Sequence, residues 1–145
     1  MRYSVNTANI TPPHVMEKSA SRILLVEDEP ALLKVVGAYL SRLGYAVTTA
    51  SSTDKAWTEV ETSPGCFSVA VLDATMPGLS MVEVATRMLQ SNPSMRVLTS
   101  SGYPVDISAL EAVAPGRVAF LHKPFAPEML AAALRRMLGT QEEHV

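Results

Sequence analysis

The chain contains 145 residues, of which 48% are hydrophobic and 18% are charged, and its formal net charge at pH 7 is −2. This size and composition suit one domain with a single core, and the small net charge argues against direct binding to nucleic acid or to an anionic membrane surface. The single cysteine cannot form an internal disulfide, and no apolar segment matches a signal peptide or a membrane span, so we expect a cytoplasmic location.

Residues 1–20 are polar and contain Pro12-Pro13, which predicts a flexible N-terminal tail. From residue 21 onward, short runs of Val, Ile and Leu alternate with amphipathic segments of helical period. In chain order we expect a strand at 23–26, a helix at 30–43, a strand at 46–50, a helix at 53–61, a strand at 69–72, a helix at 80–90, a strand at 97–100, a helix at 106–114, a strand at 118–121 and a helix at 127–138.

Strands that alternate with helices and are apolar throughout are typical of a parallel sheet covered on both faces. Five such units are too few for the eight-unit barrel, so we predict an α/β fold with an open, doubly wound sheet. Functional sites in such sheets lie in the crevice beyond the carboxyl ends of the strands. The residues that end the predicted strands are therefore the first candidates for function.

Polar side chains follow four of the five predicted strands. They are Glu27, Asp28 and Glu29 after the first strand, Asp73 after the third, Ser100 and Ser101 at the end of the fourth, and His122 and Lys123 after the fifth. Clustered carboxylates repel one another unless a cation neutralises them, and their hard oxygen ligands suit Mg²⁺. A lysine and a hydroxyl at the same edge would bind phosphate oxygens, so the pattern predicts a Mg²⁺-dependent phosphoryl-transfer site.

Four motifs at these strand ends occur in the order LLVEDE, VLDATMPG, VLTSSGY and FLHKPF, and together they resemble the receiver domain of two-component response regulators. The resemblance extends from Arg22 to about Gly139. It implies the chemotaxis-type, flavodoxin-like fold, a single five-stranded parallel sheet of strand order 2-1-3-4-5 with five helices. The expected organisation is a tail at 1–20, a receiver domain at 21–139 and a C-terminal tail at 140–145.

The resemblance also implies the roles of the acidic residues. Asp73 would be the phosphoacceptor, and Asp73, Asp28 and Glu27 would hold Mg²⁺ together with the backbone carbonyl of Thr75. Glu27 stands where most relatives have an aspartate, and its longer side chain could reach the metal through water. We therefore expect Asp28 to be the firmer ligand.

By the same resemblance, Lys123 and Ser101 would bind the phosphoryl oxygens. Phosphorylation would draw Ser101 toward these oxygens and let Phe120 turn inward, which would change the surface formed by the fourth helix, the fifth strand and the fifth helix. The further residues expected close to the phosphate are Ala74, Thr75, Gly102 and Tyr103.

Four further details carry expectations of their own. In the family, the positions of Thr75 and Tyr103 line the path of the water that hydrolyses the acyl phosphate, and the Tyr103 ring should slow that reaction. Receiver domains also resemble one another in a cis peptide, which we expect at Lys123-Pro124. Because side chains alternate along a strand, His122 should point away from the phosphate and be partly buried. Many relatives have a glycine where this sequence has Met81, so the start of the third helix could be shaped differently from theirs.

The function that the resemblance implies is that of a phosphorylation-dependent switch. The phosphoryl donor would be a histidine kinase or a histidine phosphotransfer protein, and the output would be docking to a downstream protein target. Apart from its own phosphorylation and slow dephosphorylation, we expect no enzymatic activity. The residues after Gly139 are too few for a DNA-binding output domain, which favours a stand-alone receiver. The alternative is a receiver fragment of a hybrid histidine kinase that acts as a phosphate relay.

Two other classes of protein fit the motifs less well. A small aspartate-nucleophile phosphohydrolase would resemble Asp-x-Asp at the nucleophile, but Thr75 occupies the second position and leaves no general acid. An interaction domain that works without phosphorylation would normally lack one of Asp28, Asp73 and Lys123, and this sequence has all of them.

Overall fold

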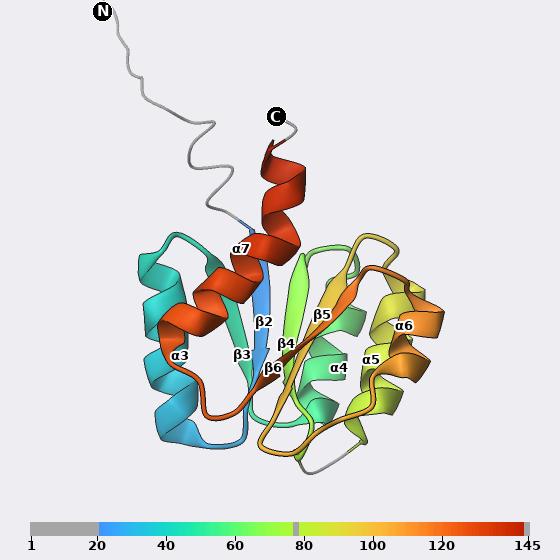
Figure 1. Cartoon of the computed structure of the whole chain (residues 1–145), viewed down its shortest axis with the longest axis horizontal. Helices are drawn as coiled ribbons and strands as arrows, with labels where there is room; N and C mark the ends of the chain where they lie inside the picture. The colour runs from blue at the N-terminus through green and yellow to red at the C-terminus, as the bar shows by residue number, and fades with distance from the viewer. Residues whose placement is uncertain (1–20, 77–78, 144–145) are drawn as a thin grey trace, which may run out of the picture.

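The computed structural model describes residues 21–76 and 79–143, the last four by their backbone alone, and shows alternating strands and helices (Figure 1). Along the chain they are β2 (Arg22–Val26), α3 (Pro30–Arg42), β3 (Ala46–Ala50), α4 (Thr53–Thr62), β4 (Val69–Asp73), α5 (Met81–Ser91), β5 (Arg96–Ser101), α6 (Ser108–Val113), β6 (Val118–His122) and α7 (Pro127–Glu143). The expected helices and strands at 21–139 are all present, while the predicted tail at 1–20 lies outside the described residues.

The five strands form one parallel sheet in the order β3-β2-β4-β5-β6. In chain order this is 2-1-3-4-5, so the predicted flavodoxin-like fold is confirmed. The central strand β4 is buried along its whole length, from Val69 to Asp73. Burial on both faces explains why the strand sequences are apolar without alternation.

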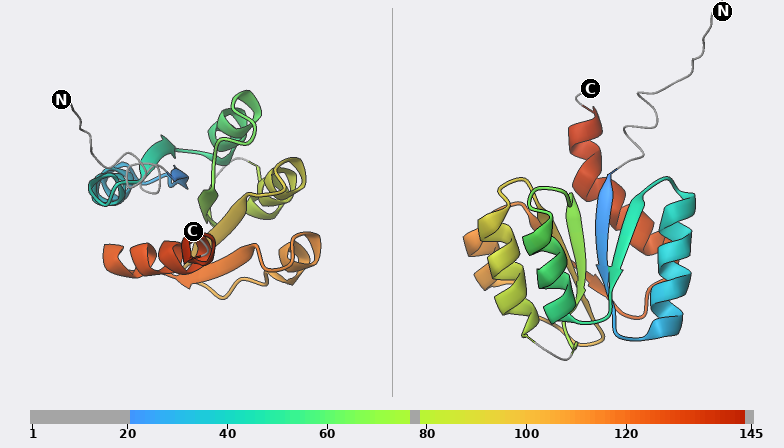
Figure 2. Two further views of the ribbon diagram at one scale, coloured as in Figure 1. Left: turned by 90° about the horizontal axis from the view of Figure 1, so that it is seen from above. Right: turned by 180° about the vertical axis from the view of Figure 1, so that it is seen from behind.

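The helices cover both faces of the sheet, with α3 and α7 on one side and α4, α5 and α6 on the other (Figure 2). Alternate residues of the strands belong to two separate hydrophobic cores, one on each face of the sheet. Leu24 and Leu72 pack with α4 and α5, whereas Leu25 and Val71 pack with α3 and α7. The two layers hold the sheet rigidly, and this fixes the positions of the residues that follow each strand.

Capping residues explain where several helices begin and end. Pro30 opens α3, and Gly44 follows the helix at a φ of 104°, a conformation that glycine adopts without steric strain. The hydroxyls of Ser52 and Ser80 accept hydrogen bonds from the backbone N–H groups of Lys55 and Glu83, so they cap α4 and α5. The replacement of the family glycine by Met81 leaves α5 regular from its first residue.

Arg117 caps the C-terminal end of α5. It lies just before β6, on the side of the sheet where the strands begin. Its guanidinium donates to the backbone carbonyls of Leu89, Asn92 and Met95 at 3.0, 2.6 and 2.9 Å. The carbonyl groups of the last helical turn have no partners within the helix, and a guanidinium with several donors can bind more than one of them. One side chain therefore joins α5, the following loop and the start of β6.

Three details differ from the sequence predictions. Helix α7 continues to Glu143, so residues 140–143, which we expected in a C-terminal tail, are helical. A single glycine, Gly139, weakens a helix by only about 1 kcal/mol, and good helix formers follow it. Helix α6 is shorter than 106–114, because the carboxylate of Asp106 accepts from the Ser108 N–H and forms a turn before the helix.

The third difference concerns His122, which is exposed and not partly buried. It ends the edge strand β6, where no helix covers it, and its ring makes an edge contact with Phe120.

The Lys123-Pro124 peptide is cis, as predicted. Among the described residues, no helix is both long and apolar enough to cross a membrane.

Candidate functional site

Asp73 is the last residue of the central strand β4, and only 3% of its surface is exposed. One carboxylate oxygen, Oδ1, accepts from both the backbone N–H and the hydroxyl of Thr75, at 2.9 Å each. The other oxygen, Oδ2, lies 2.7 Å from the Lys123 ammonium. The carboxylate is therefore fixed in orientation by donors on both of its oxygens.

Lys123 follows the edge strand β6 and joins two acidic residues from different strands. Its Nζ donates to Asp73 Oδ2 and, at 2.9 Å, to Glu27 Oε1 at the end of β2. Its backbone N–H donates to the Ser101 carbonyl at 2.8 Å, which ties the segment after β6 to the end of β5. One lysine thus contacts the ends of β2, β4 and β5.

The pKa values of these groups follow from burial and from their shared hydrogen bonds. Burial acts to raise the pKa of Asp73, but the hydrogen bonds from Lys123 and Thr75 outweigh it and hold that pKa below its ordinary value. Burial also acts against the charged form of Lys123, yet Asp73 and Glu27 together raise its pKa. Near neutral pH, Asp73 is therefore a carboxylate and Lys123 an ammonium.

Glu27 has the opposite shift from Asp73. Burial raises its pKa, and the bonds from Lys123 and from the Glu29 backbone N–H offset this only in part, with the neighbouring Asp73 charge adding to the rise. The difference has a structural cause, because Asp73 receives two further donors from Thr75. Glu27 is thus the member of the pair that holds its charge less strongly.

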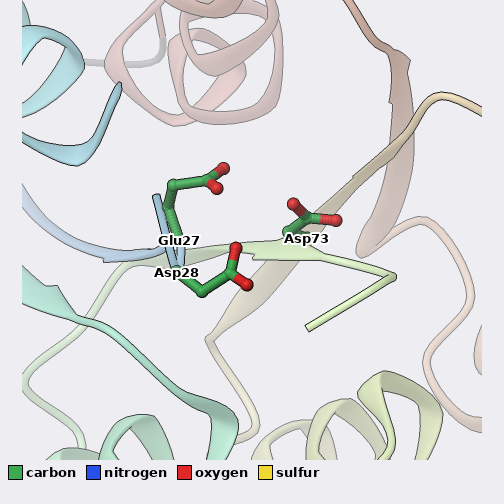
Figure 3. A group of neighbouring side chains, drawn as sticks. All are labelled: Glu27, Asp28 and Asp73. Atoms are coloured by element: carbon green, nitrogen blue, oxygen red, sulfur yellow. The ribbon is translucent and has the colours of Figure 1, made fainter. Parts of the chain in front are cut away.

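The carboxylates of Glu27, Asp28 and Asp73 offer ligand oxygens within 4.8 Å of one another. Figure 3 shows Glu27 and Asp28 at the end of β2 facing Asp73 across a short gap. Three carboxylates with one ammonium leave excess negative charge, and hard oxygen donors at this spacing suit Mg²⁺. Glu27 is buried, whereas Asp28 is exposed, so a cation held here would keep an open side for water or substrate.

The residues after β5 form the other wall of the site. Ser101 is buried, and its hydroxyl oxygen accepts from the backbone N–H of Tyr103 at 3.0 Å. Because a hydroxyl can accept and donate at once, its proton remains able to reach a further oxygen. Phe120, opposite Thr99 in the sheet register, is half-buried one strand away.

An open hollow of about 540 Å³ lies beside these groups. Lys123, Gly102 and Tyr103 are among the residues that line it, and Tyr103 is 71% exposed. The remaining lining residues are Glu29, Leu32, Pro124 and Phe125. The site is thus accessible from solvent on the side of α3, which suits a reaction with a group carried by another protein.

The structure brings together Glu27, Asp28, Asp73, Thr75 and Lys123. Ser101 lies next to this group because its carbonyl accepts from the Lys123 backbone N–H, while among the described residues its hydroxyl bonds to the Tyr103 N–H and not to the Asp73 carboxylate. Sequence reasoning missed a contact on the far side of the loop after Asp73. Thr53 and Asp54 bond to the backbone of Leu79, 26 and 25 positions away, and their only signal in the sequence was a helix-capping pattern.

Comparison with known proteins agrees with the fold. Residues 23–135 match the family model for the response regulator receiver domain. Among solved structures, a CheY-like receiver domain protein from Methanospirillum hungatei is similar with a TM-score of 0.75 and 26% identity. The match covers 87% of this chain and 99% of that one.

Two curated proteins illustrate the range of relatives. The alginate biosynthesis transcriptional regulatory protein AlgB of Pseudomonas aeruginosa is 32% identical over 121 residues, which cover 83% of this chain and 26% of that protein. The sensor kinase CckA of Brucella abortus is 30% identical over 123 residues, which cover 85% of this chain and 13% of that protein. The chain thus spans about a quarter or less of these relatives.

Proposed function

The chain belongs to the response regulator receiver domain family, and on that premise we propose that it is a phosphorylation-dependent switch that accepts a phosphoryl group on Asp73. The observation that carries the proposal is the contact of Lys123 with both Asp73 and Glu27, at 2.7 and 2.9 Å. This contact places a cation against a buried, ionised nucleophile at the edge of an open hollow.

The donor would be a phosphohistidine on a histidine kinase or a histidine phosphotransfer protein, the partners of receiver domains in two-component signalling. An Asp73 oxygen attacks phosphorus and forms a P–O bond, the P–N bond breaks, and the histidine nitrogen keeps the electron pair and is then protonated. Lys123 neutralises charge on the transferred group and holds the carboxylate for in-line attack. The Ser101 hydroxyl would donate to a phosphoryl oxygen.

The acidic group fits the Mg²⁺ ion that receiver domains bind. Asp28, Glu27, Asp73 and the carbonyl of Thr75 would hold it, with Asp28 as a firmer ligand than Glu27, whose two carboxylate oxygens already accept hydrogen bonds. When bound, Mg²⁺ supplies positive charge that stabilises the phosphoryl oxygens during transfer. Glu27 must share its oxygens with Lys123 and the Glu29 amide, which favours contact with the ion through water.

The output would be a change of the face formed by α6, β6 and α7. Movement of Ser101 toward the phosphate would leave space for Phe120, whose half-buried ring contacts His122 at a centroid distance of 6.3 Å. A downstream protein would recognise the altered face. Beyond phosphorylation and slow dephosphorylation of itself, no turnover of other substrates is part of this proposal, and its place of action would be the cytoplasm.

The test is chemical labelling with a small phosphodonor. Wild type incubated with acetyl phosphate and MgCl₂ should gain the mass of one phosphoryl group, and Asp73→Asn should gain none. Glu83→Gln, which changes an exposed carboxylate on α5, is the matched control and should label like wild type. Equal labelling of wild type and Asp73→Asn would reject Asp73 as the acceptor.

The similarity to sensor kinase CckA of Brucella abortus favours a second candidate, a receiver that relays phosphate as part of a hybrid kinase. Both functions share the chemistry at Asp73 and differ in what happens next. A relay should return its phosphoryl group to a histidine phosphotransfer protein within minutes, whereas a docking switch should retain it and bind a target. Radiolabelled receiver mixed with a purified phosphotransfer protein distinguishes the two.

A further inference from the structure

The loop between β4 and α5 is held at its far end by the start of α4. The hydroxyl of Thr53 donates to the Leu79 carbonyl at 2.7 Å. The Leu79 N–H points back at the Asp54 carboxylate at 3.4 Å, a longer and weaker contact. Both backbone polar groups of Leu79 are therefore engaged by two consecutive residues of another βα unit.

The same loop is anchored at its near end by the phosphorylation site itself. The Ala74 N–H donates to the Ser100 carbonyl at 2.8 Å, and Thr75 bonds to Asp73. Met76 is buried in the core beneath. Leu79 precedes the Ser80 cap of α5, so the contact with α4 fixes the point at which the loop enters the helix. The loop thus spans two anchors, one at each end.

The anchor on α4 is rigid for reasons visible in the structure. Thr53 is 1% exposed, and Ala56 on the next turn is fully buried in the core shared with α5. The strand that leads to α4 ends at Ala50, whose carbonyl accepts from the Glu27 N–H at 3.0 Å. Short polar contacts therefore link Leu79, through α4 and β3, to the end of β2 that carries Glu27 and Asp28.

From this arrangement we propose that Thr53 is a positioning residue for the phosphorylation site. By holding Leu79 at the start of α5, it would restrain the Thr75 backbone four positions earlier, which flanks Asp73 and whose carbonyl would be a Mg²⁺ ligand. The inference rests on the proposed function for its metal, and for its geometry on the contacts of Thr53, Asp54 and Leu79. The competing interpretation is that the Thr53 hydroxyl stabilises the fold without any effect at the site.

Two substitutions at one position separate the hydrogen bond from the packing. Thr53→Val keeps the shape and removes the donor, whereas Thr53→Ser keeps the donor and removes a methyl group. Thr58→Val, on the same helix, removes an exposed hydroxyl that donates to the Asp54 carbonyl within α4, and it serves as the control.

The first measurement is hydrogen–deuterium exchange without metal, read at the amides of Thr75, Met76 and Leu79. The second is the Mg²⁺ dissociation constant, measured calorimetrically with MgCl₂ alone. Thr53→Val should speed exchange at these amides and weaken Mg²⁺ binding roughly threefold to tenfold, the range of one buried hydrogen bond. Thr53→Ser and Thr58→Val should stay within about twofold of wild type.

The outcomes are distinguishable. Wild-type exchange and Mg²⁺ binding in Thr53→Val, or equal defects in Thr53→Val and Thr53→Ser, overturn the positioning role. If wild type itself binds no Mg²⁺, the proposed function fails, and the exchange data still decide whether Thr53 holds the loop. Should Thr53→Val not fold, Thr53→Ala takes its place and is compared with Thr53→Ser, which keeps the donor: faster exchange at Leu79 in Thr53→Ala than in Thr53→Ser supports the positioning role, and equal exchange rejects it.

Discussion

Lys123 and Asp73 lie 50 positions apart in the chain, and their side chains meet at 2.7 Å between Nζ and Oδ2. They follow strands that are not neighbours, because β5 lies between β4 and β6. The length of the lysine side chain spans this gap, and the Ser101 carbonyl on the intervening strand fixes its backbone. The contact therefore depends on how the carboxyl ends of β4, β5 and β6 are arranged in the sheet.

Replacing this lysine should impair chemistry more than folding. Lys123→Ala removes the charge that faces the transferred phosphoryl group, and we expect labelling by acetyl phosphate to slow by about a hundredfold. Mass spectra recorded over time give the rate. Lys55→Ala, at an exposed lysine on α4, is the control. A rate within about twofold of wild type in Lys123→Ala would contradict the assigned role.

Removal of one acidic residue should stabilise the metal-free protein. Asp28 lies within a group of three carboxylates whose ligand atoms are within 4.8 Å, so Asp28→Asn relieves repulsion and should raise the free energy of unfolding by about 0.5–1 kcal/mol. The same variant should lose most of the Mg²⁺-dependent rise in Tm that wild type shows. Thermal unfolding with EDTA and with MgCl₂ measures both effects, and an unchanged Mg²⁺ response would argue against Asp28 as a ligand.

The ring of Tyr103 is predicted to lengthen the life of the acyl phosphate. Tyr103 lines the same hollow as Lys123, and 71% of its surface is exposed. Tyr103→Ala should therefore speed phosphate loss by about threefold to tenfold, and Tyr103→Phe, which keeps the ring, should not. Decay of the loaded protein after removal of the donor, at fixed Mg²⁺, gives the rate. Decay that is unchanged or slower in Tyr103→Ala means that the ring does not shield the phosphate.

Arg117 provides a prediction about stability that is independent of function. Arg117→Ala leaves three backbone carbonyls without their charged donor, and we expect the free energy of unfolding to fall by about 2–3 kcal/mol. Phosphorylation at the opposite edge should keep its wild-type rate. Arg136→Ala, at an exposed site on α7, should change stability by less than about 0.5 kcal/mol. Urea unfolding of both variants makes the comparison.

The sequence was sufficient for the fold and for the identity of the family. Strands without alternation predicted a covered parallel sheet, and the rule that strand ends share one edge predicted that residues near 27, 73 and 123 would meet. The hydrogen bonds between these side chains were not predictable, because they depend on the length and orientation of each side chain. The same is true of Thr53, because its bond to Leu79 depends on how α4 docks on the core.

The remaining errors have local causes. His122 was expected to be partly buried because strand residues alternate, but this rule says nothing about an edge strand whose last residue has no helix above it. The end of α7 was placed too early because a glycine followed by polar residues was taken as a stop. A glycine ends a helix reliably only where the backbone turns to positive φ, as it does at Gly44.

The position of β6 at the margin of the sheet has a dynamic consequence. Among the described strands it pairs with β5 alone, and its burial decreases from Val118 to His122. Detaching such a strand breaks one ladder instead of two, so local opening there requires less free energy than at β4. We therefore expect amide exchange to be faster along β6, which leads to Lys123, than along β4, which ends at Asp73.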